Sequence, residues 1–276
     1  VCPYCGVGCQ IEYNVKDNKI KYVNGVDGPA NKNRLCVKGR FGFDYVNNPE
    51  RLTKPLIRIK DKPKDLHPSI NFSNIHEYFR EASWDEALDY AAQGFLKLKK
   101  QRNGKSNLAG FGSAKCSNEE AYLFQKLIRT GFNTNNVDHC TRLCHASSVA
   151  ALLETIGSGA VTAPFYEVEH SDVIIVIGAN PTENHPVAAT FFKNAAKKGS
   201  KLIVMDPRGH SLKKHATHML QFKPGSDVAL LNSIMNVIVE ENLFNSEYIK
   251  KQTEGFEKLR KHLMNYSPDI MENETG

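Results

Sequence analysis

The chain has no long hydrophobic stretch, because none of its apolar runs exceeds the five residues of Val173 to Ile177. A helix that crosses a bilayer needs about 20 such residues, so we expect no transmembrane segment.

Charge of one sign is not concentrated in any part of the sequence either. There are 36 Lys and Arg against 30 Asp and Glu, and the basic residues are scattered among the 276 positions. Scattered lysines are typical of solvated helices, which predicts that nucleic acid is not a partner.

The usual glycine fingerprint of NAD-binding folds is also missing. No Gly-x-Gly-x-x-Gly follows a predicted strand, and Gly157-Ser158-Gly159 lacks both the third glycine and the preceding strand. We therefore expect no NAD site within this sequence.

The two ends of the sequence lack the features of a complete chain. There is no initiator Met, Cys2 is already the second residue, and residues 271–276 end without a capping element. We interpret the chain as a piece of a longer polypeptide, whose signal peptide, if it had one, would lie out of view. A cytoplasmic location is our expectation.

Cysteine is present in a distinctive arrangement, since four of the seven cysteines follow the pattern C-x2-C-x3-C-x26-C. Glycines at positions 6 and 8 allow a tight turn whose backbone amides can point at sulfur. Four thiolates arranged in this way suit a four-iron cluster. The alternatives are a zinc site, which usually takes two C-x2-C pairs, and disulfides, which need an oxidising compartment. We favour the iron–sulfur cluster.

The apolar pattern changes its period along the chain. Residues 10–25 alternate as two short strands, with a turn at Asp17-Asn18, which predicts a β-rich module around the cluster. Ser83 and Glu86 form a capping box at the start of a helix that runs to about Lys100. Further predicted elements are a strand at 108–112, a helix that Asn118 caps and that runs through Arg129, and a helix over 149–155.

The second half alternates continuous apolar strands with helices. Residues 172–178 and 201–206 predict strands buried on both faces, and residues 186–198 and 228–241 predict helices. The fold class is therefore α/β, with a small β-rich [4Fe-4S] module followed by Rossmann-like αβα parallel-sheet domains. The predicted boundaries are 1–56 for the cluster module, 57–137 for part of a first α/β domain completed by later sequence, and 138–276 for a second, cofactor-binding α/β domain.

Polar segments stand where ligands of open α/β sheets bind, beyond the carboxyl ends of the strands. The three segments are residues 178–186, 206–208 and 223–227. A glycine, a helix start and an Arg or Lys suit a diphosphate and its sugar. Carboxylates such as Asp206 and Asp227 can accept hydrogen bonds from a guanine edge or from ribose hydroxyls. The alternative is that these segments are ordinary turns and caps.

A second centre contains Cys144 and His145, just before or at the start of a helix. A thiolate near a helix N-terminus with an adjacent His has a lowered pKa and is a strong ligand for a soft metal. We interpret Cys116 and Cys140 as buried, inert thiols and His139 as a structural residue.

Over essentially its whole length the chain resembles the N-terminal part of the catalytic subunit of molybdopterin-containing formate dehydrogenases, within the molybdopterin oxidoreductase superfamily. The motifs that carry the resemblance are the four cluster cysteines with Lys38, Arg51-Leu52-Thr53-Lys54-Pro55-Leu56, Asn118-Glu119-Glu120, Thr134-Asn135-Asn136-Val137-Asp138, Cys144-His145, and Asn180-Pro181 through His185-Pro186.

The resemblance implies a role for each matching residue. Lys38 lies between cluster and pterin, where it carries electrons or tunes potential. Cys144 ligates molybdenum or tungsten, and His145 accepts a proton. The [4Fe-4S] ligands are Cys2, Cys5, Cys9 and Cys36; the pterin dinucleotide contacts are Gly178, Asn180, Glu183, Asn184, Asp206, Pro207, Arg208, Gly225 and Asp227, with Lys115 and Asn118 as weaker candidates.

The activity implied is two-electron oxidation of formate to carbon dioxide at a bis(molybdopterin guanine dinucleotide) centre. Electrons would leave through the cluster to an electron-accepting subunit or ferredoxin. The alternatives are a periplasmic-type nitrate reductase, which has an apolar residue after its cysteine ligand, and a non-catalytic electron-transfer subunit like the large subunit of complex I. The family's substrate-orienting arginine lies beyond residue 276, so we expect residues 1–276 alone to be inactive on formate.

Overall fold

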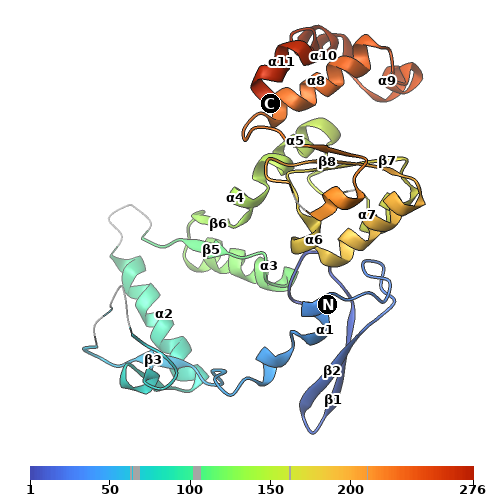
Figure 1. Ribbon diagram of the computed structural model, residues 1–276. Helices are drawn as coiled ribbons and strands as arrows, with labels where there is room; N and C mark the ends of the chain where they lie inside the picture. Colours follow the sequence, from blue (N-terminus) through green and yellow to red (C-terminus); the bar gives the residue numbers. More distant parts are fainter. Residues whose placement is uncertain (63, 65–68, 102–106, 162, 210) are drawn as a thin grey trace. The chain divides into compact units, whose positions relative to one another are not determined.

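The computed structural model describes residues 1–62, 64, 69–101, 107–161, 163–209 and 211–276 (Figure 1). Contacts divide the chain into two compact units. The first unit comprises Val1–Glu12, Val23–Arg40 and Ala163–Gly276, and the second comprises Tyr13–Tyr22 and Phe41–Thr162. The predicted domain boundaries remain a prediction, but residues 1–12 and 23–40 already pack with the C-terminal half.

A three-stranded parallel sheet forms the centre of the first unit. Its strands are β7 (Val173–Ile177), β8 (Lys201–Met205) and β9 (His218–Leu220), with β8 in the middle. Ile177 pairs with Met205, and Met205 with Leu220, so the carboxyl ends of all three strands meet at one edge. The prediction of a parallel α/β sheet is confirmed, as are its strands over 172–178 and 201–206, whereas β9 was not predicted.

Helix α7 (Pro186–Lys198) covers one face of this sheet. It buries Ala195 against Leu202 and Val204 of β8, and each of these three side chains is 0% exposed. Gly199 ends the helix in the left-handed region, as expected for a C-cap glycine. The helix predicted over 186–198 is thus confirmed at both ends.

Strand β7 is not buried on both faces, and the prediction was wrong on this point. Side chains alternate across a strand, and Ile174 and Val176 point into the core while Val173 and Ile175 are 55% and 51% exposed. The continuous apolar run indicated two covered faces. Within the described residues, only the α7 face of β7 is covered by packed side chains.

Four helices follow β9 and form a layer of their own, coloured orange to red in Figure 1. Helix α8 packs against α10 and α11, and the buried Asn236 of α8 donates to the Leu263 carbonyl at 3.0 Å. The rings of Phe244 and Phe256 contact each other at a tilt of 53°, with centroids 4.9 Å apart. The helices are α8 (Asp227–Glu240), α9 (Ser246–Gln252), α10 (Phe256–Leu263) and α11 (Pro268–Thr275).

The N-terminal strands form the hairpin that was predicted. Strand β1 (Ile11–Lys16) pairs with β2 (Lys19–Gly25), and the two turn residues, Asp17 and Asn18, have φ of 53° and 55°. Two successive left-handed residues are typical of the turn that matches the twist of a hairpin. After the hairpin the chain loops back to the short helix α1 (Val37–Phe41).

The second unit holds two small sheets and the helices α2 to α5. Ser83 accepts from the Glu86 amide at 3.1 Å, which confirms the predicted cap of α2. Ser117, rather than Asn118, caps α3, because Ser117 and Glu120 complete a reciprocal capping box one residue earlier than predicted. The elements are β3 (Leu56–Arg58), β4 (Phe79–Glu81), α2 (Trp84–Lys100), β5 (Gly110–Gly112), α3 (Asn118–Lys126), a π-helical turn (Leu127–Gly131), β6 (Val137–His139), α4 (Thr141–Cys144) and α5 (Ala146–Ile156).

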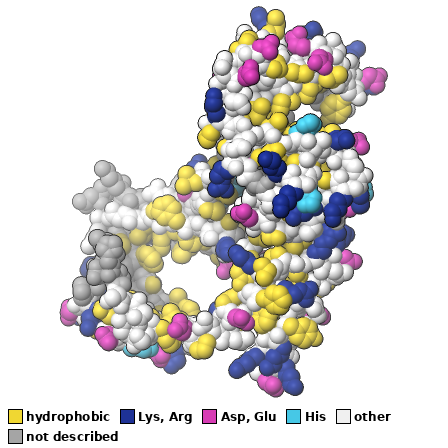
Figure 2. Space-filling model, viewed as in Figure 1, with side chains coloured by type: hydrophobic (Ala, Val, Ile, Leu, Met, Phe, Trp, Pro, Cys, Tyr) yellow, Lys and Arg dark blue, Asp and Glu magenta, His cyan; other side chains and the backbone are white. Residues whose placement is uncertain are grey.

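The surface carries mixed charge, and the remaining elements are short helical turns. Within the described residues, no helix has both the length and the apolar character to cross a bilayer. On the face shown in Figure 2, Lys and Arg side chains lie among acidic and hydrophobic ones. The remaining elements are 3-10 turns at Asp44–Asn47, Ile75–Glu77, Phe165–His170 and Ser211–His215, and the four-residue helix α6 (Pro181–Asn184).

Replacing Phe191 by Ala should lower the free energy of unfolding by about 3–5 kcal/mol, the usual cost of emptying a buried aromatic site. Phe191 is 2% exposed and lies in the cluster of buried residues that contains Cys2 and Cys9. Chemical denaturation of the purified protein measures the change. Lys197→Ala, at an exposed position of the same helix, is the control and should change stability by no more than about 0.5 kcal/mol.

Candidate cofactor sites

The four cysteines of the predicted cluster converge in the first unit. Cys2 and Cys9 are buried, at 8% and 6% exposure, and Cys5 and Cys36 pack partly buried against the same core. The Cys2 amide donates to the Cys9 carbonyl at 2.8 Å, which closes the N-terminal loop on itself. We call residues 1–12 and 23–40 together the cluster loop.

Helix α1 brings the fourth cysteine to the other three. Cys36 directly precedes α1, and its carbonyl accepts from the Arg40 amide at 3.1 Å. Gly39 faces inward, because a Cβ atom there would lie 3.8 Å from Cys2 Sγ and 3.3 Å from a methyl carbon of Leu35. A larger residue would push α1, and with it Cys36, away from Cys2.

The four thiols also influence one another electrostatically. Burial, and after it the charges of Cys2, Cys5 and Cys36, together raise the pKa of the Cys9 thiol to about 11. An apolar site that gathers four acidic thiols is unfavourable for their anions unless cations are bound there, because bound cations reverse this effect. The donor set therefore fits an iron-containing group.

One zinc ion fits these thiols less well. Within the described ranges, no group of three or more His, Cys, Asp and Glu side chains is close enough to hold a single ion. Zinc needs four ligands about 2.3 Å from one centre. In an iron–sulfur cluster the thiolates instead surround a larger body of iron and sulfide and need not meet at a single centre.

Two basic residues fix the cluster loop on α7 and its neighbours. The Arg34 guanidinium donates to Thr190 Oγ1 at 3.1 Å and lies over the Phe191 ring, 4.4 Å from its centroid. Lys32 Nζ lies 5.0 Å from the centroid of Tyr166. Lys38, the predicted electron-path residue, is exposed on α1, with Nζ 5.8 Å from the Tyr4 ring centroid.

The segments predicted to bind the pterin dinucleotide meet at the carboxyl edge of the three-stranded sheet. Gly178 follows β7 with φ of 58°, and its amide donates to the Met205 carbonyl at 3.0 Å. Asp206 follows β8, and its Oδ1 accepts from the Arg208 and Gly209 amides at 2.8 and 3.1 Å. The structure therefore brings together the strand ends that the sequence placed apart.

The loop after β7 turns through α6 to the start of α7. Asn180 accepts from the Thr182 hydroxyl, which in turn contacts Ser211 Oγ at 2.7 Å. Glu183 and Asn184 are exposed, as are Arg208, Gly225 and Asp227 on the neighbouring segments, whereas Pro207 is half-buried. Exposed polar side chains and a left-handed Gly225 (φ 87°) leave this edge open to a polar ligand.

Cys144 and His145 lie in the second unit, between two helices. Cys144 is the last residue of α4, and α5 begins at Ala146. The thiol is exposed, and His145 interrupts the helix with φ of −154° and ψ of 26°. The prediction that Cys144 precedes the next helix is confirmed. Lys115 and Asn118 lie exposed in the turn and first residue of α3.

The remaining thiols were interpreted wrongly. Cys116 and Cys140 are exposed rather than buried, because both stand in short turns where no core forms around them. The Cys116 thiol donates to the Ser113 carbonyl at 3.0 Å. His139 is structural, as expected, since its Nδ1 accepts from the Thr141 amide at 3.0 Å and starts α4.

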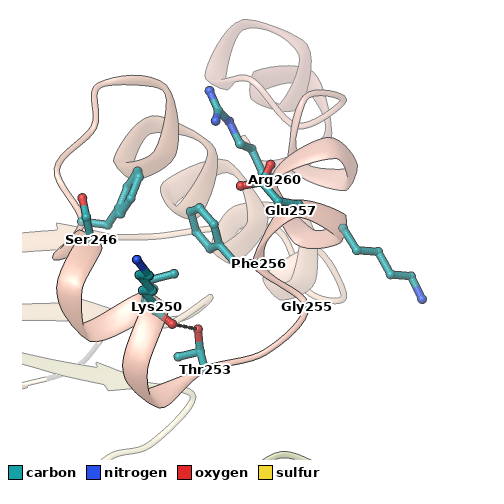
Figure 3. Close-up of a pocket in the computed structure, with 10 residues that line it drawn as sticks. Ser246, Lys250, Thr253, Gly255, Phe256, Glu257 and Arg260 are labelled. Carbon is teal, nitrogen blue, oxygen red and sulfur yellow. Dashed lines mark hydrogen bonds between the residues drawn. The ribbon is translucent and has the colours of Figure 1, made fainter.

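Two hollows lie away from most of the predicted residues. One, of about 480 Å³, opens between α9 and α10, where Phe256 and Lys250 line it (Figure 3). The other, of about 560 Å³, lies in the second unit beside β5 and is lined by Cys116, Arg129 and His139 among others. No predicted cofactor ligand lines either of them, but a third hollow, of about 430 Å³, is lined by the candidate contact Asn118 together with Glu119, Tyr122 and Leu123.

Several residues that build the cluster site were not predicted from the sequence. They include Asn31, which is 0% exposed, and Arg34. His185 also contributes, because its Nε2 would lie 4.0 Å from a Cβ atom on Gly6. The only sequence signal was an asparagine within the Gly/Asn-rich loop. Such a residue can equally be a buried structural amide or a solvated one.

Comparison with known proteins agrees with this arrangement. The Molybdopterin oxidoreductase family matches residues 51–267, and the Molybdopterin oxidoreductase Fe4S4 domain matches residues 1–48. The chain belongs to the molybdopterin oxidoreductase family. Membership of this family implies a molybdopterin cofactor, and the Fe4S4 domain implies a four-iron cluster. The cysteines and sheet-edge loops described above fit both groups.

Individual relatives within the molybdopterin oxidoreductases are similar over the whole chain. It is 38% identical over 270 residues to the F420-dependent formate dehydrogenase subunit alpha of Methanocaldococcus jannaschii, covering 98% of this chain and 37% of that protein. It is 37% identical over 281 residues to formate dehydrogenase H of Escherichia coli, covering 100% of this chain and 37% of that protein. The chain thus spans a little over a third of the length of these relatives.

A solved molybdopterin enzyme shares the fold. Acetylene hydratase from Pelobacter acetylenicus superposes with a TM-score of 0.82 at 24% identity, over 100% of this chain and 36% of that one. This likeness confirms the fold class predicted from the sequence.

The buried Cys9 thiol should make the iron-free protein less stable at high pH. Its pKa of about 11 when folded exceeds the value of about 8.5 in an unfolded chain. The folded state therefore binds the proton more tightly, and the stability this provides is present below about pH 8.5 and is lost as pH rises toward about 11. Denaturation under anaerobic, reducing conditions should show this loss. Cys9→Ala should lack it, and equal pH slopes in the two proteins would contradict the assignment.

Proposed function

We propose that this chain is part of the catalytic subunit of a formate dehydrogenase. It would oxidise formate to carbon dioxide at a molybdenum or tungsten bis(molybdopterin guanine dinucleotide) centre, with electrons leaving through the [4Fe-4S] cluster. The observation that carries the proposal is the exposed Cys144 followed directly by His145, at the junction of α4 and α5. The names of the relatives reported above support the same substrate.

The chain's own residues have separate tasks in this proposal. Cys144 would hold the metal through its thiolate, and an exposed thiol is available for that bond. The metal centre supplies a site that accepts two electrons together, whereas an iron–sulfur cluster passes on one at a time. The His145 imidazole, directly next in the chain, would hold the proton that formate releases.

The sheet edge of the first unit would hold one guanine dinucleotide. Backbone amides around the left-handed Gly178 and Gly225 suit phosphate oxygens, and the exposed Arg208 can donate to them. The exposed Asp227 carboxylate can accept from a guanine edge or from ribose hydroxyls. Lys115 and Asn118 of the second unit are further candidates for pterin contacts.

Lys38 and the cluster would carry electrons away. The ammonium of Lys38 is exposed on α1, two residues after the ligand Cys36. A cation beside a cluster favours its reduced, more negative state. An electron-accepting subunit or a ferredoxin would take the electrons, and a cytoplasmic location belongs to the same proposal.

Loss of the proton acceptor should reduce formate oxidation sharply. In the full-length holoenzyme, His145→Ala should lower kcat for formate-dependent dye reduction by about 10²–10⁴-fold, the usual contribution of a positioned acid or base. Cys144→Ser should abolish turnover. Cys140→Ser alters an exposed thiol four positions earlier and should retain activity. Full activity of His145→Ala would remove the proton role from that residue.

Metal content and substrate range separate the alternatives. Molybdenum or tungsten together with iron in the purified protein supports the catalytic proposal, whereas iron alone would support an electron-transfer subunit. Reduction of nitrate without oxidation of formate would indicate a nitrate reductase instead.

Removal of the Lys38 ammonium should slow electron exit more than chemistry. Lys38→Ala should lower steady-state dye reduction by about tenfold or more, while single-turnover reduction of the enzyme by formate stays within about twofold of wild type. Lys21→Ala, an exposed lysine on β2, is the control. Equal slowing of both phases would contradict the electron-path role.

A further inference from the structure

Asn31 is the most completely buried polar residue of the cluster loop. Its side chain is 0% exposed, and both ends of its amide are used. Oδ1 accepts from the Gln10 amide at 3.0 Å. Nδ2 donates to the carbonyls of Gln10, Val26 and Arg34 at 3.1, 3.2 and 3.1 Å. One side chain therefore bonds three separate backbone segments.

Two of these three segments carry the cluster ligands. Gln10 directly follows Cys9, and Arg34 stands two residues before Cys36. A shift at Gln10 moves Cys9, and a shift at Arg34 moves Cys36. Asn31 thus connects the N-terminal cysteine turn to the returning segment that brings the fourth thiolate.

The surrounding backbone is shaped to place this amide at the centre of the loop. Lys32 and Asn33 have φ of 45° and 63°, in the left-handed region. A Cβ atom on Gly25 would lie 2.3 Å from the Asn33 carbonyl oxygen, so only glycine permits this approach. Strained backbone of this kind persists where neighbouring bonds fix it.

An amide suits these partners because it offers an acceptor together with two N–H donors, which the three carbonyls share. The Gln10 amide needs an acceptor, and the three carbonyls need a donor. An aspartate of the same shape would place negative charge against three carbonyl oxygens. Alanine would leave the backbone groups buried without partners, which is costly in an interior site.

We propose that Asn31 is the positioning residue of the [4Fe-4S] cluster. It holds Cys9 and Cys36 in register, keeps water out of the cluster loop, and thereby sets the retention and reduction potential of the cluster. The inference rests on the cluster part of the proposed function and not on formate as the substrate.

The sign of the change in potential follows from charge. The reduced cluster carries one more negative charge than the oxidised one, and water stabilises the greater charge more strongly. A loosened loop that admits water should therefore raise the midpoint potential. It should also expose the cluster to faster loss.

The experiment compares full-length holoenzymes that carry Asn31→Asp, Asn31→Ser or Asn236→Ala. Asn236 is the matched control because it is a second buried asparagine of the first unit, and it donates to the Leu263 carbonyl at 3.0 Å among the C-terminal helices. Readouts are iron per chain, the EPR spectrum of the reduced cluster, its midpoint potential and the rate of bleaching of its visible absorbance in air.

In the Asn31→Asp and Asn31→Ser proteins the EPR spectrum of the cluster should shift and its midpoint potential should rise. The visible absorbance of the cluster should bleach in air about tenfold faster than in wild type. Asn236→Ala should lower the melting temperature with spectrum and potential unchanged. Serine retains one hydroxyl that can both donate and accept, so it is the variant to examine if the aspartate protein does not fold.

Two outcomes overturn different statements. Asn31 variants that melt earlier but keep the wild-type spectrum, potential and bleaching rate would refute the positioning role alone. A wild-type holoenzyme without about four irons per cluster site would refute the cluster itself, and with it the cluster part of the proposed function.

Discussion

The cluster loop and the sheet of the first unit share helix α7, and this shared packing is the constraint on which the candidate sites depend. Val187, Ala188 and Phe191 of α7 are buried together with Cys2 and Cys9. One turn further along the same helix, Ala195 is buried against Leu202 and Val204 of β8. One rigid helix therefore fixes both the cysteine turn and the strands whose ends form the sheet edge.

This packing also explains why the two candidate cofactor sites lie near each other in the first unit. The loop predicted to bind the pterin dinucleotide runs directly into α7 through His185, and His185 lies beside Gly6 in the cysteine turn. The chain thus needs no additional linker between the residues that would hold the cluster and those that would hold the dinucleotide. Short spacing of this kind suits a protein that passes electrons between two groups.

Local signals predicted much of this fold. The N-cap at Ser83, the hairpin turn at Asp17-Asn18 and both ends of α7 are confirmed, because each depends on residues a few positions apart. The reciprocal bond of a capping box is not formed at α2, since the Glu86 carboxylate accepts from Arg80 instead. The error at Asn118 has a local cause too, since Ser117 offers the better hydroxyl cap one residue earlier. Existence of the elements was therefore predictable, whereas their exact start depended on competing caps.

Burial was harder to predict, because it depends on partners distant in sequence. The apolar run of β7 indicated two covered faces, yet Val173 and Ile175 are exposed, and Cys116 and Cys140 are likewise exposed rather than buried. Asn31 was not predicted to be buried, because a polar residue in a polar loop gives no sign in the sequence of complete burial. Its bonds to Gln10 and Val26 arise only when the chain returns after the hairpin.

The two kinds of thiol in this chain have opposite environments, and the difference matches the chemistry proposed for them. Cys9 is buried among three other thiols, where its pKa is raised and only bound cations make its anion favourable. Cys144 is exposed, at a break between two helices.

A group that only exchanges electrons gains from exclusion of water, because its reduction potential is then set by fixed protein groups. A metal ligand at a catalytic centre must instead leave space for a cofactor and a substrate beside it. Burial at one thiol and exposure at the other are therefore what a chain with a cluster and a separate reaction centre requires.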